Sequence, residues 1–244
     1  MKLWIAVIAL LLAAPLHAGE CRNQEYAGNR YRVCEADLSK DELRLFLRTP
    51  DGAVHGHFTS VNDALKAEGL ELGFAMNAGM YHDDRAPVGL YLEQGDVAQE
   101  LITSDGPGNF GLLPNGVFCI QASGAIVMET RAFEREAPGC TYATQSGPML
   151  VIDGKLHPRF LVDGTSKYIR NGVGISADGS KAIFAISRNA VNFHEFGSFF
   201  KDQLKTPNAL YFDGNISRIY APELGIYGPG WRMGPIVGTV VPRG

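Results

Sequence analysis

The sequence of 244 residues lacks an excess of positive charge, and it lacks the sequence motifs of several large protein classes. Its 26 Asp and Glu residues outnumber its 22 Lys and Arg residues, and a mildly acidic chain argues against nucleic acid as a partner. No P-loop and no dinucleotide-binding glycine fingerprint is present. Cys-x-x-Cys pairs are missing, which disfavours a zinc site. Linkers, repeats and low-complexity tracts are missing too, so one domain is the economical interpretation.

Long apolar runs are also scarce, and the one that stands out lies at the start of the sequence. Residues 1–18, MKLWIAVIALLLAAPLHA, have one cation, Lys2, followed by a short apolar run, small residues and a proline. This order is typical of a secretory signal peptide, and the run is short for a membrane span, which needs about 20 residues. We therefore predict cleavage after Ala18. The remainder, 19–244, is predicted to be a single exported domain, periplasmic or secreted, with no membrane span after cleavage.

Cysteine is rare, with four residues at positions 21, 34, 119 and 140. An even number in an oxidising compartment suggests two disulfides, for which the sequence allows three pairings. We favour Cys21–Cys34 and Cys119–Cys140 because both closed loops are short. Free buried cysteines are the alternative.

Glycine, in contrast, is abundant, with 29 residues, and many glycines stand in short turns between apolar runs. Gln94-Gly95, Asp153-Gly154 and Asp178-Gly179 are such turns, and they predict hairpins and largely antiparallel pairing. Two helices are predicted, over 60–69 with Ser60 as N-cap and over 193–207 with an aromatic face. The pattern favours an α+β fold, with a mostly antiparallel or mixed sheet core built from hairpins and flanked by a few helices.

Polar residues gather where the predicted strands end. Four blocks share this feature: MNAGMYHDD (76–84), TQSGPML (144–150), YIRNGVGI (168–175) and NALYFDGNIS (208–217). Catalytic residues favour loops that a rigid scaffold holds, and glycine lets a ligand approach the backbone closely. One block alone is best explained as a turn, and Asp213-Gly214 alone is more often a turn than a site. Arg170 alone is more often a surface cation or a structural ion pair. Four such blocks together suggest a site.

In this order and spacing, the four blocks resemble the phosphodiester glycosidase family, over about 74–220. That family includes the animal uncovering enzyme, which removes N-acetylglucosamine from a sugar phosphodiester, and many bacterial exported proteins. The blocks depart from the family pattern at several positions. Ala78 replaces a glycine, one glycine of the Ser-Gly-Gly-Pro block is missing, and Asn171-Gly172 replaces Thr-Ala. Asn215-Ile216 replaces two glycines of the Asp-Gly-Gly-Gly-Ser block.

The resemblance implies a hydrolase of glycosyl phosphodiesters, and the residue chemistry fits that reaction. Phosphate is a good leaving group, so the reaction needs chiefly a cation near the phosphate and a carboxylate near the anomeric carbon. We predict that Arg170 holds the phosphate with its planar fork and that Asp213 acts as nucleophile or base. His82 and Glu195 are secondary acid or base candidates.

Further residues of the blocks are predicted to bind substrate: Asn77, Gly79, Tyr81, Gln145, Ser146, Asn171, Gly214 and Ser217. The expected ligand is a small-molecule or polysaccharide glycosyl phosphodiester. No cofactor is required by the sequence. A divalent cation is possible, with Asp83, Asp84 and Asp213 as oxygen ligands.

Two rival interpretations remain open. The first is a non-catalytic periplasmic protein that binds a saccharide or phosphate in the same pocket, and Asn215-Ile216 favours it because these residues break the glycine run. The second is an envelope scaffold in which the blocks are merely turns. Wide dispersal of Asn77, Ser146, Arg170 and Asp213 over the folded surface would favour that scaffold.

Overall fold

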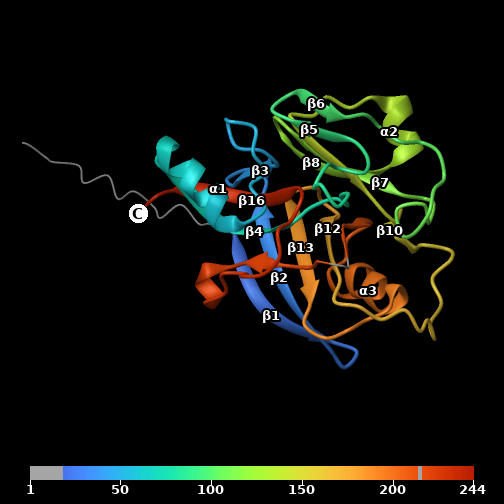
Figure 1. Cartoon of the computed structure of the whole chain (residues 1–244). Helices are drawn as coiled ribbons and strands as arrows, with labels where there is room; N and C mark the ends of the chain where they lie inside the picture. Colours follow the sequence, from blue (N-terminus) through green and yellow to red (C-terminus); the bar gives the residue numbers. More distant parts are fainter. Residues whose placement is uncertain (1–18, 214–215) are drawn as a thin grey trace, which may run out of the picture.

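A computed structural model describes residues 19–213 and 216–244 of the chain. The predicted signal peptide, 1–18, and two residues of the fourth block, Gly214 and Asn215, lie outside the described residues. In the described part, the strands form three sheets, and all paired strands are antiparallel (Figure 1). Together with three short α-helices, they confirm the predicted α+β class.

The largest sheet carries the third and fourth blocks. Its strands, in spatial order, are β1 (Glu20–Tyr26), β2 (Asn29–Asp37), β13 (Lys181–Ser187), β12 (Asn171–Ile175), β14 (Asn208–Tyr211), β10 (Met149–Ile152) and β11 (Lys155–Leu156). β12 and β14 are neighbours, and Gly172 is opposite Tyr211. Because the pairing is antiparallel, the start of β12 and the end of β14 lie at the same edge of the sheet.

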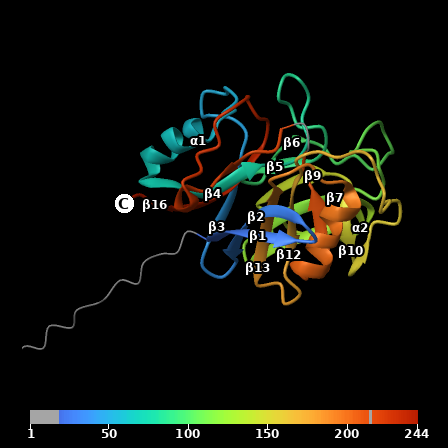
Figure 2. The same cartoon turned by 90° about the horizontal axis from the view of Figure 1, so that it is seen from below.

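Two smaller sheets complete the β structure. The four-stranded sheet has the order β15 (Ile219–Tyr220), β4 (Leu70–Asn77), β16 (Ile236–Pro242) and β3 (Glu42–Phe46). The five-stranded sheet has the order β6 (Asp96–Gln99), β5 (Tyr91–Glu93), β9 (Tyr142–Ser146), β7 (Gly116–Gln121) and β8 (Gly124–Glu129). Seen from below, β4 and β16 lie to one side of β1 and β2, and β7 lies to the other (Figure 2).

The helices are short and lie outside the sheets. They are α1 (Phe58–Leu65), α2 (Thr130–Glu136) and α3 (Phe193–Ser198), with a π-helical turn η2 (Phe199–Gln203) and two 3₁₀ turns, η1 (Lys66–Glu68) and η3 (Pro222–Leu224). α2 was not expected from the sequence. Among these helices, none is both long and apolar enough to cross a membrane.

The predicted hairpin turns are present. Gln94 and Gly95 join β5 to β6 with φ of 54° and 90°, and Asp153 and Gly154 join β10 to β11 with φ of 46° and 76°. Two successive positive φ values are the signature of the type I′ turn, whose twist matches that of paired strands.

The predicted start of the first helix was wrong. α1 begins at Phe58, with His57 as N-cap and no side-chain cap. Ser60 therefore lies inside the helix, and its hydroxyl bonds to His55 Nδ1 at 3.0 Å instead of to the backbone. The predicted stop is correct, because Gly69 ends the following 3₁₀ turn in the left-handed region with φ of 72°.

The second predicted helix is correct in its buried face and too long at its end. Phe196, Phe199, Phe200 and Leu204 are buried against the large sheet, as the aromatic pattern indicated. The α-helix ends at Ser198, and the π turn that follows it ends at Gln203. Tyr31 of β2 stacks on Phe199 with ring centroids 3.8 Å apart, which fixes this helix on the sheet.

The main core lies between the sheets. Phe184 of the large sheet packs on Phe74 of β4 at 5.3 Å and on Phe118 of β7 at 5.8 Å. Phe118 also contacts Phe212, at 6.3 Å, directly before Asp213. The backbone that carries Asp213 therefore leaves a packed core.

Both predicted disulfides are formed. Cys21 and Cys34 are directly opposite each other in β1 and β2, and Cys119 of β7 is bonded to Cys140, just before β9. The pairing prediction is confirmed, and two structural disulfides fit an exported protein.

Candidate active site

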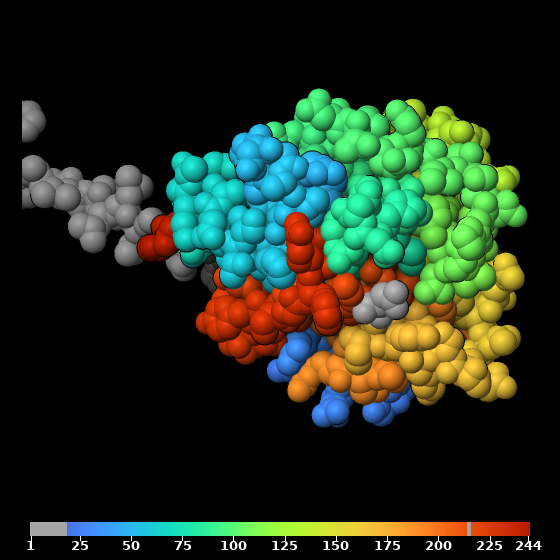
Figure 3. Space-filling view, in the orientation of Figure 1, coloured from blue at the N-terminus to red at the C-terminus, as the bar shows by residue number. Residues whose placement is uncertain are grey.

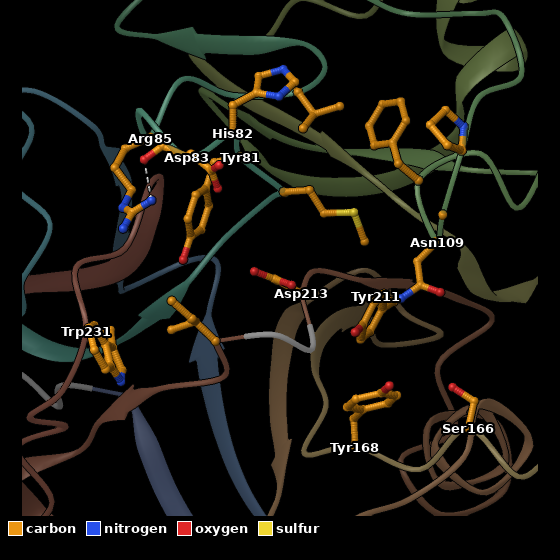
Figure 4. Close-up of a pocket in the computed structure, with 16 residues that line it drawn as sticks. Tyr81, His82, Asp83, Arg85, Asn109, Ser166, Tyr168, Tyr211, Asp213 and Trp231 are labelled. Carbon is orange, nitrogen blue, oxygen red and sulfur yellow. Dashed lines mark hydrogen bonds between the residues drawn. The ribbon is translucent and has the colours of Figure 1, made fainter.

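A cavity of about 910 Å³ opens where the polar blocks meet. Segments around 80–88, 107–110 and 166–168 surround it, and their atoms are the teal, green and yellow ones around the hollow in Figure 3. Polar and aromatic side chains dominate the lining, among them Tyr81, His82, Asp83, Arg85, Asn109, Ser166, Tyr168, Tyr211, Asp213 and Trp231 (Figure 4).

Asp213 lies in the middle of this cavity because β14 ends just before it. Tyr211 is the last residue of β14, Phe212 is buried in the core, and Asp213 then faces the cavity. Figure 4 shows the carboxylate between the rings of Tyr81 and Tyr211. A carboxylate on a rigid strand end, rather than on a long loop, is held in a fixed position.

The two tyrosines beside Asp213 stay protonated at neutral pH. Burial raises the pKa of Tyr81 to about 12, and the negative charge of Asp213 adds to the effect. Burial also raises the pKa of Tyr211 well above its ordinary value, where Arg170 lowers it and Asp213 raises it. Both phenol oxygens are buried, and neither makes a hydrogen bond of standard geometry within the described residues. Each can therefore donate to an oxygen of a bound ligand.

Arg170 lies behind the cavity wall rather than in it. Its side chain is fully buried, with the guanidinium carbon 3.6 Å from the ring centroid of Phe193 and 5.3 Å from that of Tyr211. Nε donates to the carbonyl of Val191 and Nη2 to that of Ser166, both at 2.9 Å, and Nη1 is buried without a partner of standard geometry. Burial lowers the pKa of Arg170. Two of its three nitrogens are thus already engaged, and the guanidinium also interacts with the Tyr211 phenol, which leaves the positive charge as its influence on a ligand.

A buried amide network holds the backbone of Asp213. Asn171 Oδ1 accepts from the Asp213 amide at 3.2 Å, and Asn171 Nδ2 donates to the Asn77 carbonyl at 2.8 Å. Ser217 Oγ donates to the Asp213 carbonyl at 2.8 Å, and Asn77 Oδ1 accepts from the Arg218 amide at 2.9 Å. The first, third and fourth blocks thus meet around one residue, which contradicts the scaffold interpretation with dispersed turns.

The second block contacts the backbone next to Asp213 and does not line the cavity. Ser146 Oγ donates to the Phe212 carbonyl at 2.6 Å, next to Asp213. Gln145 is buried and bridges loops, because its Oε1 accepts from the amides of Leu90 and Ile102. Neither Gln145 nor Ser146 lines the cavity.

Gly79 is needed for a close approach of backbone to backbone. A Cβ at this position would lie 2.6 Å from the carbonyl oxygen of Gln145. The missing side chain of Gly79 therefore lets the first block pack closely on β9. Glycine at this position serves packing rather than ligand contact.

The two secondary acid and base candidates have different surroundings. His82 lines the cavity. Glu195 does not, because its carboxylate accepts from the Asn192 amide at 2.7 Å in a capping box and pairs with Lys167 at 2.9 Å. Glu195 is thereby committed to the start of α3.

The described residues contain no cluster of side chains that could bind a metal ion. No group of three His, Cys, Asp or Glu side chains there is close enough to hold an ion. Asp83 and Asp213 both line the cavity, whereas Asp84 does not and accepts from the Ala86 amide at 2.9 Å.

Residues 71–226 match the family model described as phosphodiester glycosidase. The chain belongs to the phosphodiester glycosidase family. A relative in Escherichia coli K12, the uncharacterized protein YigE, is 34% identical over 180 residues, which are 74% of this chain and 70% of YigE.

Solved structures share the fold at low sequence identity. The catalytic domain of zebrafish N-acetylglucosamine-1-phosphodiester alpha-N-acetylglucosaminidase, auto-inhibited by its pro-peptide, is similar with a TM-score of 0.62 and 14% identity, over 93% of this chain and 84% of that one. A hypothetical protein from Synechocystis gives a TM-score of 0.59 and 13% identity, over 91% of this chain and 61% of that one. A putative exported protein of Burkholderia pseudomallei gives 0.55 and 11%, over 86% and 74%.

Several cavity residues of this phosphodiester glycosidase family member were missed in the sequence. Tyr211 stands in an apolar run that reads as strand core, and only its place two residues before Asp213 could have marked it. Asn109 lies in a loop without a motif, and Tyr168 is the first residue of the third block but carried no predicted role. Trp231 follows the last block, and a lone tryptophan in a Gly- and Pro-rich segment was the available signal.

Proposed function

We propose that this chain is an exported hydrolase that cleaves a sugar-1-phosphodiester in the cell envelope. Membership of the phosphodiester glycosidase family supports the reaction class. The observation that carries the proposal is the position of the Asp213 carboxylate, in a cavity between two protonated phenols, one of which contacts the buried Arg170. The similar zebrafish enzyme acts, by its name, on an N-acetylglucosamine-1-phosphodiester.

In the proposed reaction, Asp213 attacks the anomeric carbon or takes a proton from the water that does. The bond between that carbon and the phosphate oxygen breaks, and its electron pair leaves with the phosphate as a monoester. When Asp213 is the nucleophile, water then cleaves the glycosyl ester formed on it, which releases the free sugar and restores the carboxylate. Because this leaving group is weakly basic, strong general acid catalysis is not needed. The hydroxyl of Tyr211 donates to a departing oxygen, and the charge of Arg170 behind it favours the phosphate on this side of the cavity.

Arg170 has a narrower role than the sequence suggested. Its Nε and Nη2 are engaged by carbonyls and its side chain is fully buried, so it contributes its positive charge in place of a two-nitrogen grip. Asn77, Asn171, Ser146 and Ser217 act as positioning residues for Asp213, because each bonds within the network that holds its backbone.

The test is turnover of pyranosyl phosphodiesters by Asp213→Asn. We expect this variant to lose activity by a factor of at least about 10³ and to keep its melting temperature, because Asn is nearly isosteric. The matched control is Asp153→Asn, which changes the aspartate of the exposed Asp-Gly turn at the end of β10. Full activity of Asp213→Asn would refute the role of this carboxylate. Arg170 is too deeply buried to be a clean probe, since its replacement would also disturb the core.

A binding protein is the second candidate, and Ile216 favours it. This branched side chain replaces a family glycine and lines the cavity. Calorimetry with pyranosyl phosphodiesters, followed by analysis of the same samples for free sugar, separates the two functions. Heat of binding without any product would support the binding protein.

A further inference from the structure

The cavity has an exposed aromatic side chain at its edge that the proposed chemistry does not use. Trp231 lines the cavity and is 81% exposed, the most exposed of the large hydrophobic side chains described. Single exposed apolar residues are common on protein surfaces. Trp231 differs because it stands at the mouth of the cavity that contains Asp213.

The backbone beneath Trp231 is fixed. Arg218 donates from Nη1 to the carbonyl of Trp231 and from Nη2 to that of Gly228, so one guanidinium clamps both ends of this turn. The next residues are tied to the body as well, because the Met233 amide donates to the Gly56 carbonyl at 2.9 Å. An aromatic ring on a clamped backbone loses little conformational entropy when a ligand covers it.

The position of Trp231 relative to the charges indicates which part of a substrate it meets. Figure 4 shows Trp231 on the side of Tyr81 and Arg85, across Asp213 from Tyr168 and Tyr211. Arg170 lies behind Tyr168 and Tyr211, and in the proposed reaction the anionic phosphate is bound on that side. The sugar, on the other side of the anomeric carbon, then extends toward Trp231.

We propose that Trp231 is a stacking platform for the pyranose ring whose anomeric carbon faces Asp213. This proposal rests on the proposed function for the orientation of the substrate. A pyranose has a face of C–H groups that is apolar enough to cover an indole, while its hydroxyls stay free for polar partners such as Asp83 and Arg85. Phosphate and glycerol lack such a face.

The sequence offers a direct optical test. The chain has two tryptophans, Trp4 and Trp231, and Trp4 lies within 1–18. In a Trp4→Phe variant of the full chain, Trp231 is the only tryptophan whether or not residues 1–18 are removed. Its fluorescence then reports on the platform without any need for turnover.

The titration uses glucose 1-phosphate, galactose 1-phosphate and N-acetylglucosamine 1-phosphate as probes. Glycerol 3-phosphate, inorganic phosphate and adenosine 5′-monophosphate serve as controls. We expect a saturable change of emission with at least one sugar phosphate and none with the first two controls. No response to any sugar phosphate, an equal response to glycerol 3-phosphate, or a stronger response to adenosine monophosphate would overturn the proposal.

Variants give a second measurement, by calorimetry with the sugar phosphate that responds. Trp231→Ala should weaken binding about tenfold, because about 60 Å² of apolar contact is lost. Trp231→Phe should stay within about threefold of the parent, since a smaller ring still offers a flat face. Tyr227→Ala is the matched control, because Tyr227 is also exposed, at 63%, lies on the same segment and does not line the cavity. Equal losses in Trp231→Ala and Tyr227→Ala would refute the platform.

The outcomes keep this proposal apart from the proposed function. Sugar phosphate binding at Trp231 without hydrolysis of any phosphodiester would refute the proposed hydrolase function and support the stacking platform. Hydrolysis with an unchanged KM in Trp231→Ala would sink the platform and leave the hydrolase.

Discussion

Replacing Asn171 with alanine removes the amide that links three of the four polar blocks. Asn171 is fully buried at the start of β12. Its side chain accepts from the Asp213 amide and donates to the Asn77 carbonyl. Alanine keeps the backbone pairing of β12 but leaves both of those backbone groups without this partner.

The expected loss follows from these two bonds. A buried polar group left without its partner costs about 1–3 kcal/mol, so the variant should lose about 3 kcal/mol of unfolding free energy. For a chain of this size, 1 kcal/mol corresponds to about 2–4 °C in melting temperature, which gives a decrease of about 6–12 °C. Turnover should fall further than stability, because Asp213 is no longer held.

The assay is urea denaturation of parent and variant, with turnover measured where both are folded. Asn189→Ala is the matched control, because the Asn189 side chain also donates one hydrogen bond of 2.8 Å, to Asn29, and accepts another of 2.8 Å, from the Arg30 amide. Asn189 is nearer the surface, so water can replace those bonds and the loss should stay below about 1 kcal/mol. Equal losses in the two variants would refute the argument that the network around Asp213 is held by burial.

Three further predictions concern stability and protonation. Tyr81→Phe should leave the melting temperature unchanged within error, because the buried Oη makes no bond of standard geometry. Turnover by this variant should fall, and a large drop of its melting temperature in calorimetry would contradict the prediction. Replacing Cys119 and Cys140 together with serine opens a loop of 21 residues and should lower the unfolding free energy, measured by urea denaturation, by about 3 kcal/mol. Reductant should cause no further loss at this site, because the variant has no disulfide there to reduce. Burial raises the pKa of Glu35, but hydrogen bonds from Lys181 and Arg22 lower it by more than burial raises it. The pKa of Glu35 in the folded state therefore lies below the unfolded value of about 4.5. The unfolded state therefore binds more protons, and the stabilisation by Glu35 is present above about pH 4.5 and is lost as pH falls through the folded pKa; a Glu35→Gln variant whose deficit stays constant from pH 7 to pH 3 would contradict it.

The meeting of the polar blocks could be predicted from the sequence, because each block ends or begins an apolar strand. Antiparallel pairing then brings Arg170, before β12, and Asp213, after β14, to one edge. Hairpin turns with positive φ and the cysteine spacing were equally local signals. Local chemistry also misled in one case, since Ser60 prefers the ring of His55 to a cap.

The depth of each side chain could not be predicted. Arg170 reads as a ligand for phosphate, but Phe193, more than twenty residues later in the chain, covers its guanidinium. Ser146 reads as a ligand too, and its hydroxyl turns to the Phe212 carbonyl instead. Trp231 reaches the cavity because Arg218 clamps its turn, a contact that no motif records. Such long-range packing decides which polar residues face a cavity and which support it.

The central claim is that Asp213 acts at the anomeric carbon of a sugar-1-phosphodiester. The most direct measurement is hydrolysis of a pyranosyl phosphodiester in water labelled with heavy oxygen, followed by mass spectrometry of the phosphate product. Attack at carbon predicts a phosphate monoester without label, and no turnover with Asp213→Asn. A labelled phosphate would place the attack at phosphorus and contradict the account.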